Sequence, residues 1–222
     1  MAKAFIFDMD GVIVDTERAW ELYGDSFLLK LFGKEIREKV GDTVGMTINE
    51  EYAKAKEYGF FINKQKFIKI YDEKAKYVFS KAAITPDVDL LAKKLIEMKF
   101  KMGLVSSSRR VWINYLLPRL SFGENIEYII SINDQTDLKP KPFPDAYLEI
   151  IEKLKASPDT TIILEDSNRG IEAAKAAGAF TIGLTQDLVE GYTQEGANVY
   201  AGNMKDVIKL AKDFSAKIDG NF

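Results

Sequence analysis

The sequence predicts an α/β protein with a doubly wound, mostly parallel, Rossmann-like sheet and an inserted α-helical domain. Through residues 85–222, short apolar segments typical of buried strands alternate with amphipathic helical segments, which is typical of a parallel sheet covered on both faces. One further strand-like segment stands at the N-terminus, whereas residues 16–84 show helical periodicity without strand-like alternation. We therefore expect a core of residues 1–15 and 85–222, interrupted by a helical domain of residues 16–84.

The first expected strand covers residues 4–10, where an apolar run leads into Asp8 and Asp10, followed by Gly11. Side chains at i and i+2 of an extended strand point to the same side. Two carboxylates placed this way repel each other, which favours a bound cation or a shared proton. Gly11 would let the chain turn with its backbone open to a ligand. A strand with an ordinary acidic turn explains the stretch equally well, so the remaining segments decide between the two interpretations.

The inserted segment is interpreted as a small helical module whose aromatic residues form its own core. Apolar residues recur at helical spacing, glycines at positions 33 and 41 break the first pattern, and Asn63 is a favourable helix N-cap. The expected helices cover residues 19–32, 49–58 and 63–79, with hinges to the core near residues 14–16 and 83–86.

The remaining chain supplies the other strands of the sheet and the helices that cover it. Ser167 and Gly178 are a candidate N-cap and a candidate C-terminal glycine around one of these helices. Strands are expected at residues 101–106, 128–132, 161–164 and 180–184, and helices at 87–100, 109–120, 144–155, 168–177 and 203–216.

Composition narrows the chemistry of any site. The 222 residues carry a net charge of −3, which gives no reason to expect binding to nucleic acid or to an anionic membrane. Neither Cys nor His is present, which excludes disulfides, thiolate or His-ligated metal sites and Ser-His-Asp triads. A metal must be held by oxygen, which favours Mg²⁺, and an acid or base must be Asp, Glu, Lys or Tyr. No segment resembles a signal peptide or a spanning helix, so we expect a cytoplasmic protein.

The residues whose side chains could take part in catalysis or binding follow the carboxyl ends of the expected strands, where ligands bind in open α/β sheets. Carboxylates hold a hard cation, whereas serine, lysine and the backbone N–H groups of a helix N-terminus hold an anion. A cation, an anion and a nucleophilic carboxylate together indicate phosphoryl transfer. The residues at this edge are Asp8, Asp10, Ser106, Ser107, Ser108, Lys141, Glu165 and Asp166.

Each piece also has an ordinary explanation. The three serines are explained by a helix cap, and most lysines are solvated. The negative charges of Glu165 and Asp166 would stabilise the N-terminus of the following helix electrostatically. Prolines on both sides of Lys141 stiffen its loop. Because all four features stand at strand ends, a functional site explains them better than coincidence.

These segments resemble the four motifs of the haloacid dehalogenase-like hydrolase superfamily, closest to its β-phosphoglucomutase-like and sugar-phosphatase group. Residues 7–17 resemble the first motif, and Ser106 after Gly-Leu-Val resembles the second. Lys141 in Lys-Pro-Phe-Pro-Asp resembles the third, which is a fuller match than the register that starts at Lys139. Residues 164–174 resemble the fourth, and a helical cap inserted after the first motif belongs to the same pattern.

The resemblance implies a role for each residue. Asp8 would attack phosphorus and form an aspartyl phosphate, and Asp10 would protonate the leaving oxygen and then activate water. Ser106 and Lys141 would hold the phosphoryl oxygens. Mg²⁺ would be held by Asp8, the backbone carbonyl of Asp10, and Asp166, with Glu165 close by.

Two departures from the mutase pattern favour a phosphatase that acts on a small sugar or polyol phosphate. The mutase has a histidine in its first cap helix, where this chain has Trp20, and an arginine shortly after the cap-loop glycine, where this chain has none. Without these anchors for a second phosphate, a bisphosphate intermediate is disfavoured. A β-phosphoglucomutase-like mutase is the alternative, because the overall resemblance is to that group. A non-catalytic phosphometabolite-binding protein is a third interpretation, which the complete set of catalytic residue types disfavours.

Further residues are candidates to contact the substrate beyond the phosphate, although packing in the cap or a solvated surface explains each of them equally well. The partner expected is a small phosphorylated metabolite, and the protein is expected to be a monomer or weak homodimer. The substrate-binding candidates are Trp20, Gly45, Thr47, Lys74, Ser106, Ser107, Ser108, Arg109 and Lys141.

Overall fold

The computed structural model describes residues 2–41, 43, 46–186, 188 and 191–220. Within these residues, six strands form one parallel sheet in the order β5-β4-β1-β6-β7-β8. The strand order grows outward in both directions from β1, which is the doubly wound arrangement, so the expected fold class is confirmed. The strands are β1 (Ala2–Phe7), β4 (Phe100–Ser106), β5 (Ile126–Ser131), β6 (Ala156–Glu165), β7 (Phe180–Leu184) and β8 (Val199–Ala201).

Strand β1 is apolar at every position from Ala4 to Phe7 because both of its faces are covered. Phe5 and Phe7 pack into one hydrophobic cluster, and Ala4 and Ile6 pack into a second cluster on the opposite face. All four residues are fully buried. A continuous apolar run, rather than alternation, is what a strand buried on both faces requires.

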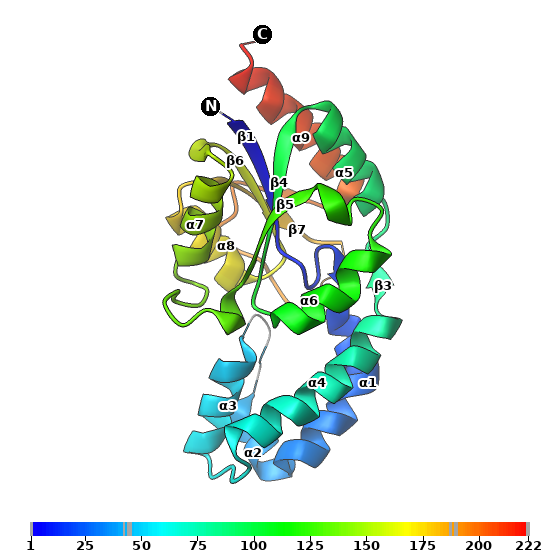
Figure 1. The fold of residues 1–222 in the computed structure, drawn as a ribbon, viewed down its shortest axis with the longest axis vertical. Coiled ribbons are helices and arrows are strands. Elements are labelled where there is room, and N and C mark those ends of the chain that lie inside the picture. The colour runs from blue at the N-terminus through cyan, green and yellow to red at the C-terminus, as the bar shows by residue number, and fades with distance from the viewer. Residues whose placement is uncertain (1, 42, 44–45, 187, 189–190, 221–222) are drawn as a thin grey trace.

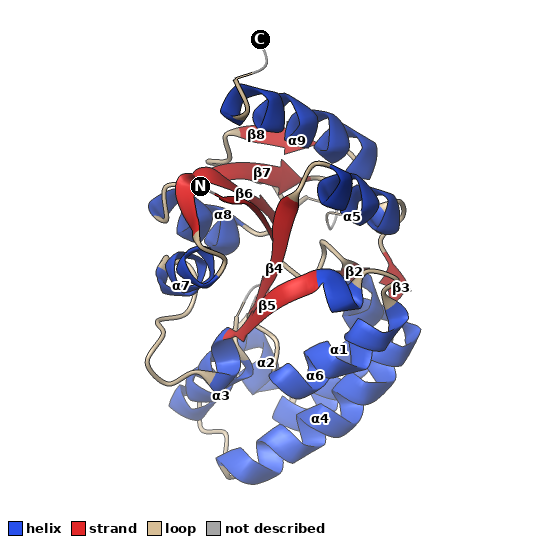
Figure 2. Ribbon diagram, turned by 45° about the horizontal axis from the view of Figure 1, so that its top comes forward, coloured by secondary structure: helices blue, strands red, loops and turns tan. Residues whose placement is uncertain are grey.

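Helices cover both faces of the sheet (Figure 2). Helices α5 and α9 contribute to the cluster around Phe5, whereas α7 and α8 contribute to the cluster around Ile6. No helix in the described part of the chain is long and apolar enough to cross a membrane. The covering helices are α5 (Val88–Glu97), α7 (Asp145–Lys153), α8 (Asn168–Ala176) and α9 (Met204–Ile218).

The inserted helices lie together at one end of the molecule, beyond the carboxyl ends of the strands (Figure 1). Two short antiparallel strands, β2 (Val14–Asp15) and β3 (Ala83–Ile84), pair where the chain enters and leaves this group. We call the four helices the helical module: α1 (Thr16–Phe32), α2 (Lys34–Val40), α3 (Ile48–Glu57) and α4 (Lys64–Lys81).

Aromatic rings fill the interior of the helical module. Phe67 on α4 is fully buried and its ring centroid lies 5.0 Å from that of Tyr71 and 5.9 Å from that of Phe32. Trp112, from helix α6 (Arg110–Leu116) of the sheet region, stacks on Tyr71 at 6.1 Å. The aromatic core of the module therefore extends across to the first helix after β4.

The first strand ends earlier than the sequence predicts. It stops at Phe7, and the backbone N–H groups of Ile13 and Val14 both donate to the carbonyl of Met9, at 2.9 and 3.2 Å. Asp8 and Asp10 therefore lie in a compact turn after the strand, and the alternation of an extended strand does not set their orientation. A turn rich in apolar residues reads as strand in the sequence because the turn itself is buried.

Five other elements also differ from the expectations. The edge strand β8 and the pair β2 and β3 are each only two or three residues long, too short to give a periodic signal. The expected helix at 109–120 ends at Leu116 and continues as a 3₁₀ turn that contains Pro118, because proline interrupts helical hydrogen bonding. Strand β6 begins at Ala156, five residues before its expected start.

Candidate active site

Asp8 leaves the end of β1 at the centre of the sheet edge. Its backbone N–H donates to the carbonyl of Leu164 on β6 at 3.0 Å, so the residue is held between two strand ends. The side chain is nearly buried, with 5% of the residue exposed. Burial raises the pKa of Asp8 well above its usual value, although the ammonium of Lys141 opposes the shift.

Lys141 reaches this carboxylate from the loop between β5 and α7. Its Nζ lies 2.5 Å from Oδ1 of Asp8 and 2.5 Å from Oε1 of Glu165, and only 2% of the residue is exposed. Burial disfavours the charged amine, but the two carboxylates outweigh it and raise the pKa of Lys141 well above its usual value. The structure thus brings Lys141 to the carboxylates, whereas Lys139 is exposed and lies over the ring of Phe143.

Glu165, the last residue of β6, is fully buried and accepts hydrogen bonds on both carboxylate oxygens. Oε1 accepts from the hydroxyl of Tyr147 at 2.5 Å as well as from Lys141. Oε2 accepts from the backbone N–H and the hydroxyl of Ser167 at 3.3 and 3.1 Å. Glu165 therefore helps to position the ammonium of Lys141. Tyr147 in turn helps to position Glu165, although no sequence motif marks it.

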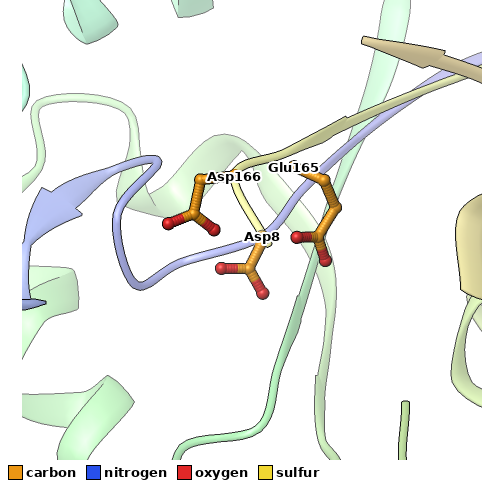
Figure 3. Close-up of side chains that lie close together, drawn as sticks. All are labelled: Asp8, Glu165 and Asp166. Atoms are coloured by element: carbon orange, nitrogen blue, oxygen red, sulfur yellow. The ribbon is translucent and has the colours of Figure 1, made fainter. Parts of the chain in front are cut away.

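Three carboxylates could hold a metal ion together. One oxygen each of Asp8, Glu165 and Asp166 lies within 4.8 Å of the others, and Figure 3 shows the three side chains side by side. This donor set consists of oxygen alone, which suits a hard cation such as Mg²⁺. Gly11 has a φ of +76°, and a Cβ at that position would lie 1.8 Å from Oδ2 of Asp166. The turn after β1 therefore packs its backbone directly against this carboxylate.

Asp10 accepts hydrogen bonds from three hydroxyl groups. Thr16 donates to Oδ1 at 2.7 Å, and Ser108 and Ser106 donate to Oδ2 at 2.8 and 3.1 Å. Burial raises the pKa of Asp10, and the hydroxyl groups oppose the rise. Ser106 thus contacts Asp10 in this structure, and its expected contact with a phosphoryl oxygen stays a prediction. Thr16 stands in the first motif, but only the fold shows that it binds Asp10.

The motif pattern and the geometry agree with a comparison against known families. A model described as haloacid dehalogenase-like hydrolase matches residues 5–184, which is most of the chain. The chain belongs to the haloacid dehalogenase-like hydrolase family. The match spans all four motif segments and the inserted helices, so the expected family is confirmed.

Relatives within the haloacid dehalogenase-like family include both phosphatases and a mutase. The chain is 30% identical over 200 residues to a phosphorylated carbohydrates phosphatase of Thermotoga maritima, covering 85% of this chain and 88% of the relative. It is 30% identical over 220 residues to a β-phosphoglucomutase of Bacillus subtilis, covering 92% of this chain and 91% of the relative. Together with the family match, the relatives named phosphatases confirm the expected enzyme class, a phosphoric monoester hydrolase.

The fold is also that of known structures of this family. A crystal structure of β-phosphoglucomutase from Clostridium difficile superimposes with a TM-score of 0.76 at 24% identity, covering 98% of this chain and 99% of that chain. At this identity the similarity establishes the fold alone. The sheet and the helical module are therefore arranged as in the haloacid dehalogenase-like hydrolases.

The substrate-binding candidates of the helical module make contacts within the protein. Thr47 is buried and caps α3 in a capping box with Glu50, since its Oγ1 accepts from the Glu50 N–H at 3.2 Å. Trp20 packs its ring 5.7 Å from Tyr71, and the Nζ of Lys74 lies 5.3 Å from the ring of Tyr77. Gly45 lies outside the described residues. Their expected contacts with substrate stay predictions.

The candidates of the loop after β4 also have partners in the protein. Ser107 is half-buried, and Ser108 contacts Asp10 as described above. Arg109 forms an ion pair with Asp72 of α4, and its Nε lies 3.6 Å from Oδ1 of Asp134. The sequence did not identify either aspartate, because the residues around Asp72 and Asp134 form no motif that would distinguish them from ordinary surface aspartates.

Proposed function

We propose that this haloacid dehalogenase-like enzyme is a Mg²⁺-dependent phosphatase that hydrolyses a small sugar or polyol phosphate through an aspartyl phosphate on Asp8. The observation that carries the proposal is the buried carboxylate of Asp8, held between the ammonium of Lys141 and the acidic pair Glu165 and Asp166. A carboxylate in such a place can face an electrophilic phosphorus whose oxygens are met by the ammonium of Lys141 on one side and by a cation held on the acidic residues on the other. The relative from Thermotoga maritima, named a phosphorylated carbohydrates phosphatase, supports this substrate class.

The protein groups divide the reaction between them. An oxygen of Asp8 would attack phosphorus as the bond to the leaving oxygen breaks, and Asp10 would give that oxygen a proton. Burial raises the pKa of Asp10, which favours the protonated form that this step needs. In the second step Asp10 would take a proton from the water that attacks the aspartyl phosphate. Lys141 and Ser106 would hold the phosphoryl oxygens throughout.

The carboxylates of Asp8 and Asp166 and the backbone carbonyl of Asp10 would hold Mg²⁺. The ion supplies charge stabilisation to the phosphoryl oxygens when bound. Both oxygens of Glu165 already accept hydrogen bonds from protein donors. We therefore place Glu165 beside the metal, where it positions Lys141.

The helical module, residues 16–84, is proposed to act as a cap over a core of residues 1–15 and 85–222. It lies beyond the strand ends that carry Asp8 and Asp166 (Figure 1), and the paired strands β2 and β3 form its connection. Such a cap would exclude bulk water from the phosphoryl group. Trp20, Thr47 and Lys74 of the module would face the leaving group from this side, and Arg109 would face it from the loop after β4.

Phosphorus NMR tests the proposal. The purified protein is incubated with Mg²⁺ and a panel of sugar and polyol phosphates that includes β-glucose 1-phosphate, with Asp8→Asn as the control. Growth of inorganic phosphate with the native protein alone supports the phosphatase. Stoichiometric formation of a 6-phosphate ester without inorganic phosphate would instead show a mutase. A folded protein that binds Mg²⁺ and turns over no ester would be a binding protein.

A further inference from the structure

Arg109 lies between two carboxylates at the boundary between the helical module and the sheet. Its Nη1 contacts Oδ2 of Asp72 on α4, and its Nε lies 3.6 Å from Oδ1 of Asp134, in the loop after β5. The Arg109 side chain is 22% exposed. One cationic group therefore stands between two anionic groups, and this cluster carries a formal charge of −1.

Both carboxylates are fixed by donors other than Arg109. The indole N–H of Trp112 donates to Oδ1 of Asp72 at 2.7 Å. The backbone N–H of Arg110 and the hydroxyl of Ser131 donate to Oδ2 of Asp134 at 2.6 and 3.0 Å. Since each acid is already oriented, the guanidinium is held in a preformed site and is not a mobile surface side chain.

The cluster is connected to the proposed reaction centre through two serines. The hydroxyl oxygen of Ser131 lies 3.0 Å from Oδ2 of Asp134 and 2.8 Å from the backbone carbonyl oxygen of Ser108, and its single proton is shared between these two acceptors. The hydroxyl of Ser108 in turn donates to Asp10 at 2.8 Å. Arg109 follows Ser108 directly, so the cluster lies next to the serine that contacts Asp10, the residue proposed to protonate the leaving oxygen.

An arginine at the edge of a phosphate site would ordinarily attract a second anionic group of the substrate. Here its charge is neutralised, and the second carboxylate makes the local potential repulsive to anions. We propose that the Asp72–Arg109–Asp134 cluster selects substrates with a single phosphate and an uncharged polyhydroxyl leaving group. This inference rests on the proposed phosphatase function and names Asp72 as a specificity-determining residue for it.

The test compares a hexose 6-phosphate with the corresponding hexose 1,6-bisphosphate. Asp72→Asn keeps an oxygen to accept from Trp112 and removes the charge. We expect the ratio of kcat/KM for bisphosphate over monophosphate to rise at least tenfold, mainly through KM for the bisphosphate. The matched control is Glu73→Gln, an exposed neighbour on α4 that changes the net charge equally. Its ratio should equal that of the native protein.

Asp134→Asn provides a second route to the same result from the sheet side, and it keeps an acceptor for Arg110 and Ser131. An unchanged ratio in folded Asp72→Asn and Asp134→Asn proteins would overturn the inference, and so would an equal rise in Glu73→Gln. In that case the cluster only ties α4 to the loop after β5. Thermal unfolding of each variant identifies any that fails to fold.

Binding measurements separate this inference from the proposed function. Titration calorimetry with Mg²⁺, on Asp8→Asn with and without Asp72→Asn, gives affinities for both esters when no turnover occurs. If the native protein releases no phosphate, the phosphatase proposal fails. A tenfold shift of the affinity ratio toward the bisphosphate would still establish the selection by Asp72, and its absence would refute it.

Discussion

At the scale of single residues, two glycines let carboxylates approach the backbone at the proposed metal site. A Cβ at Gly11 would lie 1.8 Å from Asp166, and a Cβ at Gly170 would lie 2.0 Å from the carboxylate of Glu165. Such distances leave no room for a methyl group without movement of the acid. Each glycine thus keeps an acidic side chain in the position where it faces Asp8.

Gly11→Ala tests this requirement. The alanine would displace Asp166, so we expect Mg²⁺ affinity and kcat/KM each to fall by about 100-fold, which corresponds to roughly 3 kcal/mol. Gly59→Ala is the control, because Gly59 also has a positive φ, of +90°, but no heavy atom lies within 4 Å of its added Cβ. That variant should lose only about 1 kcal/mol of stability. Calorimetric Mg²⁺ titration of both proteins checks the prediction, and equal affinities would contradict it.

Glu51 of α3 gives the helical module a pH-dependent stability. Burial raises its pKa to about 7, opposed by hydrogen bonds from the hydroxyl of Tyr71 at 2.6 and 2.7 Å and by the charge of Arg37. From about pH 4.5, its ordinary pKa, to about pH 7, the folded protein keeps a proton that the unfolded chain has lost. The contribution of Glu51 to stability is therefore present below this window and is lost as the pH rises through it.

Glu51→Gln should remove this dependence. The free energy of unfolding of the variant, relative to the native protein, should rise between pH 5 and pH 8 by up to about 3 kcal/mol. Urea denaturation at several pH values measures it. Glu57→Gln, at an exposed position of the same helix, should show a difference that does not change with pH. A difference that stays flat for Glu51→Gln would mean that the buried acid is ionised throughout.

At the scale of elements, long periodic segments were predictable and short or buried irregular ones were not. The first five parallel strands and the main helices follow from apolar runs and helical spacing, which local sequence carries. Strand β8, with three residues, carries too little pattern to be seen. The start of the turn after β1 was expected as strand because the apolar run continues to Met9, a residue that the structure shows fully buried. Its shape depends on hydrogen bonds to the carbonyl of Met9, which only the folded chain reveals.

The candidate site likewise contains residues that the sequence predicts and partners that it does not. Asp8, Asp10, Lys141 and Asp166 follow strand ends, so the topology alone brings them to one edge of the sheet. Tyr147 and Asp72 act through contacts that span 18 and 37 residues of sequence. No local pattern marks such partners, because a tyrosine on a buried helical face and an aspartate on a helix surface are both common.

Thr47 illustrates an element-level prediction that distinguishes two roles. Its hydroxyl accepts from the Glu50 N–H, and the Glu50 carboxylate accepts from the Thr47 N–H at 2.8 Å. Thr47→Ala should therefore lower the free energy of unfolding by about 1 kcal/mol, whereas Thr47→Ser should be nearly neutral because it keeps the cap. Urea denaturation checks stability, and KM for the best substrate is measured in parallel. A large rise of KM without loss of stability would show a direct contact with substrate instead.

At the scale of the whole molecule, polar contacts join the helical module to the sheet across the proposed site. Arg169, in the first turn of α8, donates from Nη2 to Oε1 of Glu50 at 2.6 Å and also to the backbone carbonyl of Lys141. Asn49 donates from its side chain to the carbonyl of Asn133 at 3.0 Å. One guanidinium thus links α3 of the module to the loop that presents Lys141. If the module acts as the proposed cap, its closure and the position of Lys141 would therefore be connected through Arg169.

Arg169→Ala should raise KM about tenfold and lower kcat, because it removes both the link to α3 and a support of the Lys141 loop. Glu50→Gln keeps one acceptor oxygen for the capping box and loses the charge and the acceptor that face Arg169, so it should raise KM with little change in kcat. The two effects on KM should not add in the double variant, since both act through one ion pair.

Lys175→Ala, at an exposed position of α8, is the matched control. Steady-state kinetics at two ionic strengths completes the test, because the KM of the native protein should rise with salt more than that of Glu50→Gln. Additive effects on KM would show that Arg169 supports Lys141 without linking it to the module.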